Sequence, residues 1–192
     1  MPRVKKKLCI DPGHGLGNRS KEVYDPGAIS AGVSEADIVL AYGLAIKWIG
    51  KSRGIDVFLT RESENEVTPV GRRDNLASEA GCDLFVSLHC NAASPSANGT
   101  ETFYRDDEDK KLAKLLNSAV LAALQFRDRG VKHESKTQHP RLSVLDFDGP
   151  ACLIELGFIS NTNNREKLLL RSSRLAVAHA ILDTLEKEYG LQ

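Results

Sequence analysis

Short apolar runs alternate with longer amphipathic stretches along the 192 residues of the chain. Each apolar run has the length of a buried strand and is followed by residues that are common in turns. The runs that predict strands are residues 4–10, 55–60, 83–88, 100–104, 142–145 and 150–154. Strands that alternate with helices favour parallel pairing. We therefore expect an α/β fold with a single, mainly parallel, twisted sheet of about six strands and helices on both faces.

The predicted helices are stretches in which apolar residues recur every three or four positions. The first begins at Ser34, a favoured N-cap residue, carries Glu35 in its first turn and runs to about residue 52. The other predicted helices cover residues 69–80, 112–126 and 178–189. Residues 16–33 and 131–140 are polar and are expected to be loops. No repeat or linker divides the chain, so we expect one catalytic domain over residues 1–192.

Three of the predicted strands lead into a residue that can bind a metal or transfer a proton. These residues are His14, which follows Asp-Pro-Gly, then His89 and Glu155. Proline has no hydrogen to donate to a sheet, and glycine permits a sharp turn, so we expect His14 in a turn at a strand end. Ligands bind to open α/β sheets at the carboxyl ends of the strands. The pattern therefore predicts a functional site at this edge.

Each of these polar residues also has a structural interpretation. His14 can cap a strand end, His89 can be a buried histidine with a hydrogen-bond partner, and Glu35 can interact with the helix dipole alone. Glu155 lies between Ile154 and Leu156. A carboxylate there is costly to bury unless it is paired or protonated. Such surroundings raise the pKa of a carboxyl group toward that of a base that works near neutral pH.

Composition argues against several classes of protein. Lys and Arg together number 26, as do Asp and Glu, so the formal net charge is zero and a nucleic-acid partner is not expected. No apolar run approaches the roughly 20 residues of a membrane helix, and the basic first residues lead into a strand. We therefore expect no membrane insertion, and synthesis in the cytoplasm without a signal peptide. The four cysteines form no Cys-x-x-Cys pair and are expected to be reduced.

Several motifs, in their order along the chain, resemble a known family. They are Asp-Pro-Gly-His-Gly at residues 11–15, Ser-Leu-His-Cys-Asn-Ala at 87–92 and Ile-Glu-Leu-Gly-Phe-Ile-Ser-Asn at 154–161, with further likeness at 59–61 and 73–77. The chain is similar to the zinc-dependent N-acetylmuramoyl-L-alanine amidases that have a His-Glu-His zinc site, often called amidase type 3. The likeness covers nearly the whole chain, but residues 18–24 are an apparent addition to the family pattern.

The resemblance implies a site made from the residues named above. One Zn²⁺ per chain would be held by His14, Glu35 and His89, and Glu155 would be the general base. Two histidines and one carboxylate, with a fourth position left for water, are an established ligand set for catalytic zinc. Ser34 anchors the start of the helix, so Glu35 is expected to project from a rigid end.

Secondary candidates for supporting the site or contacting the substrate are Asn91, Glu101 and Arg61. Arg61 and Arg73 match family positions, and buttressing of the sheet edge explains them at least as well as substrate contact. For Glu101, alternation in the strand favours an ordinary surface residue over a role in the site. The remaining histidines are expected at the surface: His133, His139 and His179.

The resemblance also implies a function, which is hydrolysis of the amide bond between N-acetylmuramic acid and L-alanine in peptidoglycan. The enzyme would act on the cell wall after release, as a phage endolysin, as a bacterial enzyme that acts on cell lysis, or as part of a longer chain. Two alternatives are another peptidoglycan zinc peptidase (a carboxypeptidase or endopeptidase) and a non-catalytic wall-binding module. Some relatives block their site with a helix after the second histidine. Residues 91–99 include Pro95 and no carboxylate, so we expect an open cleft, a monomer and no activator protein.

Overall fold

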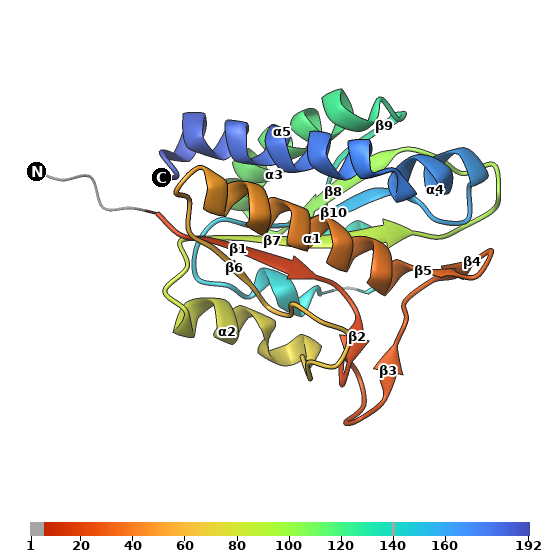
Figure 1. The fold of residues 1–192 in the computed structure, drawn as a ribbon, viewed down its shortest axis with the longest axis horizontal. Coiled ribbons are helices and arrows are strands. Elements are labelled where there is room, and N and C mark those ends of the chain that lie inside the picture. The colour runs from red at the N-terminus through yellow and green to blue at the C-terminus, as the bar shows by residue number, and fades with distance from the viewer. Residues whose placement is uncertain (1–5, 140) are drawn as a thin grey trace, which may run out of the picture.

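The computed structural model describes residues 6–139 and 141–192 and is built around one six-stranded sheet (Figure 1). The strands, in their order across the sheet, are β6 (Val57–Leu59), β1 (Leu8–Pro12), β7 (Leu84–Asn91), β10 (Ala151–Phe158), β8 (Thr100–Tyr104) and β9 (Asp128–His133). The first four are parallel to one another, and β8 pairs antiparallel with β10. The mainly parallel sheet of about six strands is confirmed.

Helices cover the two faces of the sheet unequally (Figure 1). Three long helices, α1 (Glu35–Ser52), α3 (Asp107–Leu124) and α5 (Arg171–Tyr189), pack against one face and form the larger core. The opposite face carries the short α2 (Arg73–Glu79) and single 3₁₀ turns at Val70–Arg72 and Ser143–Leu145. The second face therefore has room for a cleft.

The alternation of side chains along the central strands assigns each residue to a face. In β7, Leu84, Val86 and Leu88 enter the larger core, while Phe85 packs in the smaller core on the other face. His89 is an even number of residues from Phe85 and lies on the same side. Glu155 follows Ala151 and Leu153 of the smaller core in the same way. The candidate residues of both strands therefore share the less covered face.

The first strand begins later and ends later than predicted. Residues 4 and 5 of the expected strand lie outside the described residues, and β1 continues through Asp11 and Pro12, which pair with Ser87 and Leu88. Proline is tolerated because it stands at the last position of the strand. Pairing therefore continues two residues beyond the predicted end at residue 10, and the chain turns at Gly13.

The stretch expected to be a long loop contains two small hairpins. Strands β2 (Gly15–Leu16) and β3 (Tyr24–Asp25) pair antiparallel, as do β4 (Ile29–Ser30) and β5 (Val33–Ser34). They lie between β1 and α1 (Figure 1). Strands of two residues are too short to produce a detectable alternation in sequence. The apparent addition at residues 18–24 forms most of the first hairpin's turn.

One of the six predicted strands, at residues 142–145, is wrong. Residues 142–145 form a 3₁₀ turn at Ser143–Leu145, where Val144 and Leu145 are buried in the smaller core. The sheet instead ends with β9, in a stretch that was partly predicted as a loop. As an edge strand that is partly exposed along its length, β9 has few of the apolar residues by which a strand is recognised.

The predicted helices all form, with different boundaries. The Ser34 hydroxyl accepts a hydrogen bond from the Asp37 amide (3.1 Å) and caps α1 as expected. Helix α3 begins earlier than predicted because Asp106 caps it, and its amphipathic part starts a turn later. Helix α5 also begins earlier, and the polar helix α4 (Thr162–Leu169) was not predicted.

Candidate metal centre and cleft

Two histidines and one glutamate converge at the carboxyl edge of the sheet. His14 lies in the turn after β1, His89 in β7, and Glu35 is the first residue of α1, which reaches this edge from the other face. One ligand atom from each lies within 4.8 Å of the other two. The Glu35 Oε1 atom is 3.0 Å from Nε2 of His14 and 2.9 Å from Nδ1 of His89. The structure brings together the three residues that the sequence indicated as metal ligands.

Glu35 is held more firmly than its place at a helix start suggests. Its side chain is buried, with the residue 4% exposed, and its two oxygens accept hydrogen bonds from the amides of Cys90 (2.9 Å) and Ala28 (3.0 Å). Burial alone would raise the pKa of this carboxyl group, but the hydrogen bonds from His14 and His89 outweigh it and hold the pKa far below its ordinary value. Glu35 is therefore an anion with a fixed orientation.

Asp25 orients His14 and was not among the predicted site residues. Its Oδ2 atom is 3.2 Å from Nδ1 of His14, on the side of the ring away from Glu35. Asn18 donates to the same oxygen (2.6 Å), and the Gly27 amide donates to Oδ1 (2.9 Å). Because Nδ1 of His14 is engaged, Nε2 faces Glu35 and His89. Burial lowers the pKa of His14, but Glu35 and Asp25 together raise it.

Two glycines allow the close approach of the candidate ligands. A Cβ atom on Gly13 would lie 2.4 Å from the ring of His89, and one on Gly27 would lie 2.6 Å from the Glu35 carboxylate. His14 itself has a φ of 61°, in the left-handed region that residues other than glycine rarely adopt. Such strained backbone persists where the surroundings fix it, and is frequent at functional sites.

Buried polar residues fix the turn that carries His14. Asp11 is fully buried and accepts hydrogen bonds from Thr60, Ser87 and Arg73. Arg73 also donates to the carbonyls of Pro12 (3.0 Å) and His14 (2.7 Å).

Arg61 has the same supporting position. It is 0% exposed and donates to the carbonyls of Pro12 (2.9 Å), Gly13 (2.8 Å) and Ala36 (2.8 Å). Its guanidinium group thus connects the turn after β1 to the first helix. The geometry favours buttressing over substrate contact for both arginines.

Glu155 lies beside the candidate ligands on the neighbouring strand. In the sheet it pairs with His89 of β7 on one side and with Glu101 of β8 on the other. Its Oε2 atom is buried without a hydrogen-bond partner among the described residues. Burial, and then the negative charges of Glu35 and Glu101, raise the pKa of Glu155 well above its ordinary value. A carboxyl group in this state is suited to accept a proton near neutral pH.

Glu101 is a buried member of the site and not the surface residue that strand alternation also allowed. It is 4% exposed, accepts a hydrogen bond from the Asn91 side chain (2.6 Å) and pairs with Arg129 (2.9 Å) and Lys132. Both basic residues come from β9, the strand that the sequence did not predict in full. The ion pairs and the amide explain how this carboxylate is buried as an anion.

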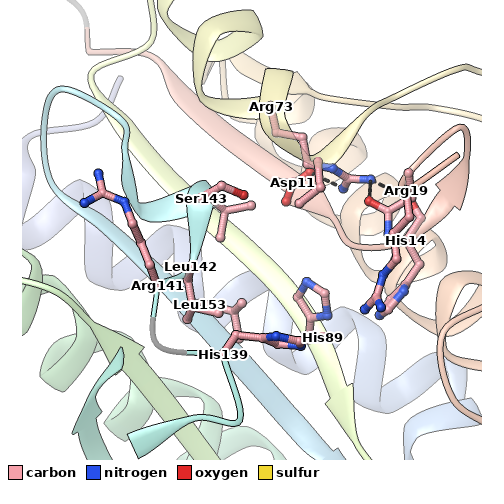
Figure 2. Close-up of a pocket in the computed structure, with 13 residues that line it drawn as sticks. Asp11, His14, Arg19, Arg73, His89, His139, Arg141, Leu142, Ser143 and Leu153 are labelled. Carbon is pink, nitrogen blue, oxygen red and sulfur yellow. Dashed lines mark hydrogen bonds and ion pairs between the residues drawn. The ribbon is translucent and has the colours of Figure 1, made fainter. Parts of the chain in front are cut away.

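Two adjoining pockets, of about 440 and 420 Å³, lie beside the candidate ligands. His14 and His89 line both pockets, and Glu35 lines the second. Figure 2 shows the first, with Asp11, His14 and Arg73 on one side and Arg141, Leu142 and Ser143 on the other. Glu155, Glu101 and Asn91 line the second pocket. His139 is exposed, as predicted, but it lines both pockets, which nothing in its sequence context indicated.

Residues 92–99, which follow β7, contain no helix, in agreement with the expected open cleft. All four cysteines are free, as expected. Within the part of the chain that the structure describes, no helix is both long and apolar enough to span a bilayer.

Comparisons with known proteins agree with this geometry. Residues 8–187 match the family described as N-acetylmuramoyl-L-alanine amidase. The chain is 33% identical to the uncharacterized protein YqiI of Bacillus subtilis, over 98% of this chain and 87% of that protein. It is 30% identical to the N-acetylmuramoyl-L-alanine amidase CwlM of Bacillus licheniformis, over 96% of this chain and 69% of that protein.

The fold also matches a solved structure. The catalytic domain of CwlV, an N-acetylmuramoyl-L-alanine amidase from Bacillus (Paenibacillus) polymyxa, superimposes with a TM-score of 0.83 at 28% identity. The match covers 97% of this chain and 99% of that domain. The chain therefore belongs to the N-acetylmuramoyl-L-alanine amidase family, whose members are hydrolases of cell-wall peptidoglycan.

Proposed function

We propose that this chain binds one Zn²⁺ through His14, Glu35 and His89 and hydrolyses the amide between N-acetylmuramic acid and L-alanine, with Glu155 as general base. The observation that carries the proposal is the pair of carboxyl groups at one edge. Glu35 is fixed as an anion between two imidazoles, and Glu155 has a buried oxygen without a partner. Neighbouring carboxyl groups whose environments separate their pKa values are typical of an acid–base site.

The donor set fits zinc. Two imidazole nitrogens and one carboxylate oxygen leave a fourth position for water or substrate, as in other catalytic zinc sites. The other ring nitrogen of His14, Nδ1, donates a hydrogen bond to Asp25. A hydrogen bond of this kind is usual behind a metal-binding histidine. Glu35 lies at a rigid helix start, His14 in a buttressed turn and His89 in a central strand. Little rearrangement of these residues is therefore needed to bind a metal ion.

A zinc ion held by His14, Glu35 and His89 would supply Lewis acidity to the amide carbonyl and to the attacking water. Glu155 removes a proton from that water and delivers one to the leaving amine of L-alanine. Its raised pKa makes it a stronger base than an exposed carboxylate. Asp25 holds His14 in one orientation, and Arg61 and Arg73 keep the turn after β1 in place.

The open cleft supports activity without a partner protein. The segment after His89 is short, has no helix and carries no carboxylate that could occupy a metal's open position. We therefore propose that the domain acts as a monomer on peptidoglycan in the cell wall and requires no activator.

The test is a product analysis with purified protein, isolated peptidoglycan sacculi and stoichiometric zinc. An amidase leaves glycan strands free of peptide and exposes new alanine amino termini. Release of terminal D-alanine would instead indicate a carboxypeptidase, and cleaved cross-links an endopeptidase. Binding to sacculi without any new amino termini would indicate a wall-binding module. Activity that appears only after a host protein is added would reject activator independence.

A further inference from the structure

One segment forms the far wall of both pockets. This cleft wall comprises residues 134–139 and 141–145 and supplies Leu142 and His139 to each pocket. It adds Lys136, Thr137 and Gln138 to the pocket that contains Glu155. It adds Arg141, Ser143 and Val144 to the other. Arg141 and Ser143 lie across this pocket from Asp11 and His14 (Figure 2). A substrate that fills either pocket must contact the cleft wall.

The described residues of the cleft wall belong to no strand of the sheet. Their regular structure is limited to single 3₁₀ turns at Glu134–Lys136 and Ser143–Leu145. A segment with so few backbone hydrogen bonds depends on side chains for its position. Val144 and Leu145 provide one anchor in the smaller core, but no residue from 135 to 139 is buried.

Arg105 holds both ends of the cleft wall. It follows β8 directly, and its guanidinium group donates to both carboxylate oxygens of Glu134 (2.6 and 3.0 Å). The same group donates to the carbonyls of Leu142 (2.8 Å) and Leu145 (2.6 Å) and also contacts Asp146. One side chain thus ties the start of the cleft wall to its end.

The geometry of this contact is suited to fix a position. Glu134 is 5% exposed, and its second oxygen also accepts a hydrogen bond from the Leu142 amide (2.7 Å). The forked pair between arginine and a carboxylate restricts orientation as well as distance. Arg105 is itself anchored, because its amide donates to Asp109 at the start of α3 (3.1 Å).

We propose that Arg105 is a positioning residue for the hydrolytic reaction, which holds the cleft wall at the spacing that substrate binding requires. Arg105 lines neither pocket and acts through the cleft wall. Its effect on catalysis rests on the proposed function, whereas its anchoring of the wall does not. The candidate ligands and Glu155 belong to other elements, so loss of Arg105 weakens substrate binding and leaves the chemical step nearly intact.

The experiment compares Arg105→Gln with the wild type and with Arg53→Gln as a matched control. Arg53 donates to Asp183 (2.5 Å) and Glu186 (2.9 Å) between α1 and α5, at residues that line neither pocket. On a soluble muramyl peptide, Arg105→Gln should raise KM about tenfold and change kcat less than about twofold. Metal content should stay at the wild-type value, and Arg53→Gln should keep the wild-type KM.

Limited trypsin digestion of the metal-free proteins tests the anchoring without any substrate. Lys136 and Arg141 are exposed cleavage sites in the cleft wall. Cleavage after them should accelerate at least about tenfold in Arg105→Gln and stay at the wild-type rate in Arg53→Gln. If Arg105→Gln fails to fold, Glu134→Gln removes one charge of the same pair and should accelerate the same cleavages to a smaller extent.

Two results would overturn the proposal. One is a wild-type rate of cleavage in both Arg105→Gln and Glu134→Gln. The other is a fall in kcat at unchanged KM, which would mean that Arg105 acts on the chemical step. Failure of the wild-type protein to release alanine amino termini would reject the proposed function, and the trypsin result would still decide whether Arg105 anchors the cleft wall.

Discussion

The two sides of the cleft treat a buried carboxyl group in opposite ways. On the side of β1 and α1, Glu35 accepts hydrogen bonds from two imidazoles and two amides, and its pKa is held far below the ordinary value. On the side of β10 and β8, Glu155 has a buried oxygen with no partner, and its pKa is raised. The same residue type is thus a fixed anion on one side and a carboxyl group with a raised pKa on the other.

The supporting residues differ in the same way. Asp11, Arg61 and Arg73 are buried beneath the turn that carries His14. Asp11 accepts a hydrogen bond from Arg73, and both arginines donate to backbone carbonyls of the turn, while one nitrogen of each arginine has no partner among the described residues. The charges that shift the pKa of Glu155 are those of two further carboxylates, Glu35 and Glu101. The hydrogen bonds that stabilise buried charge are concentrated on the side of the candidate metal ligands, and the unfavourable interaction between carboxyl groups on the side of Glu155.

The largest expected effect separates these two roles. His89→Ala should lose equimolar zinc and all measurable activity, because two ligands would remain. Glu155→Gln should keep one zinc per chain and the fold but lose at least about 100-fold in rate, the usual scale for a positioned base. Elemental analysis and alanine-terminus release measure the two quantities.

The assignments would be wrong if these outcomes were exchanged. Zinc retained in His89→Ala would remove His89 from the ligand set, and zinc lost from Glu155→Gln would make Glu155 a ligand. Glu35→Gln is the matched variant for Glu155→Gln, because the charge change is the same and the expected loss is zinc.

The central residues of the site could be predicted because each stands next to a strong local pattern. His89 and Glu155 end strands of buried apolar residues, and Glu35 follows a helix cap. Residues whose role depends on distant segments could not be predicted in the same way. Asp25 reaches His14 only through the small β2–β3 hairpin, and His139 lines the cleft on a segment whose first residue, Glu134, binds the distant Arg105.

The fold follows the same division. The central strands are apolar on both faces and were predicted close to their observed positions, although the first was placed too early. The edge strand β9 is polar because one of its sides faces solvent, so its sequence resembles a loop. The burial of Glu101 depended on this strand, since both of its cationic partners belong to it. An error at the sheet edge therefore carried over into the site.

The next largest effect concerns the stability of the metal-binding side. Arg73→Met should cost about 3–5 kcal/mol of unfolding free energy, because it leaves the buried Asp11 carboxylate without its ion-pair partner. Arg72→Met is the control, since Arg72 forms an exposed pair with Glu79 (3.4 Å), and should cost less than about 0.5 kcal/mol. Urea unfolding of the metal-free proteins measures both. Equal losses in the two variants would show that the buried pair is not what stabilises the turn.

On the Glu155 side of the cleft, we expect a substitution to increase the free energy of unfolding instead of lowering it. The pKa of Glu155 is higher in the folded than in the unfolded protein, so the carboxyl group favours folding most below its unfolded pKa of about 4.5. That contribution is lost as pH rises through the folded pKa. Metal-free Glu155→Gln should therefore be more stable than the wild type at pH 7, and the difference should vanish below about pH 4. A less stable variant at pH 7 would contradict the raised pKa.

The smallest expected effect tests how Glu101 influences its neighbour. Glu101 is negative and raises the pKa of Glu155, while Lys132 and Arg129 offset its charge. Lys132→Met removes one positive charge from this cluster, so the carboxylate form of Glu155 becomes less favourable and its pKa should rise. Lys132 is partly exposed, and solvent weakens the effect, so we expect only a small rise in the pKa of Glu155. Carboxyl NMR titration of the metal-free protein measures the pKa of Glu155, with Glu155→Gln assigning the signal.

Lys136→Met is the control, because Lys136 also lines the pocket but forms no ion pair with Glu101 in the described structure. A downward shift in Lys132→Met would contradict the proposed effect of the Glu101 charge on Glu155.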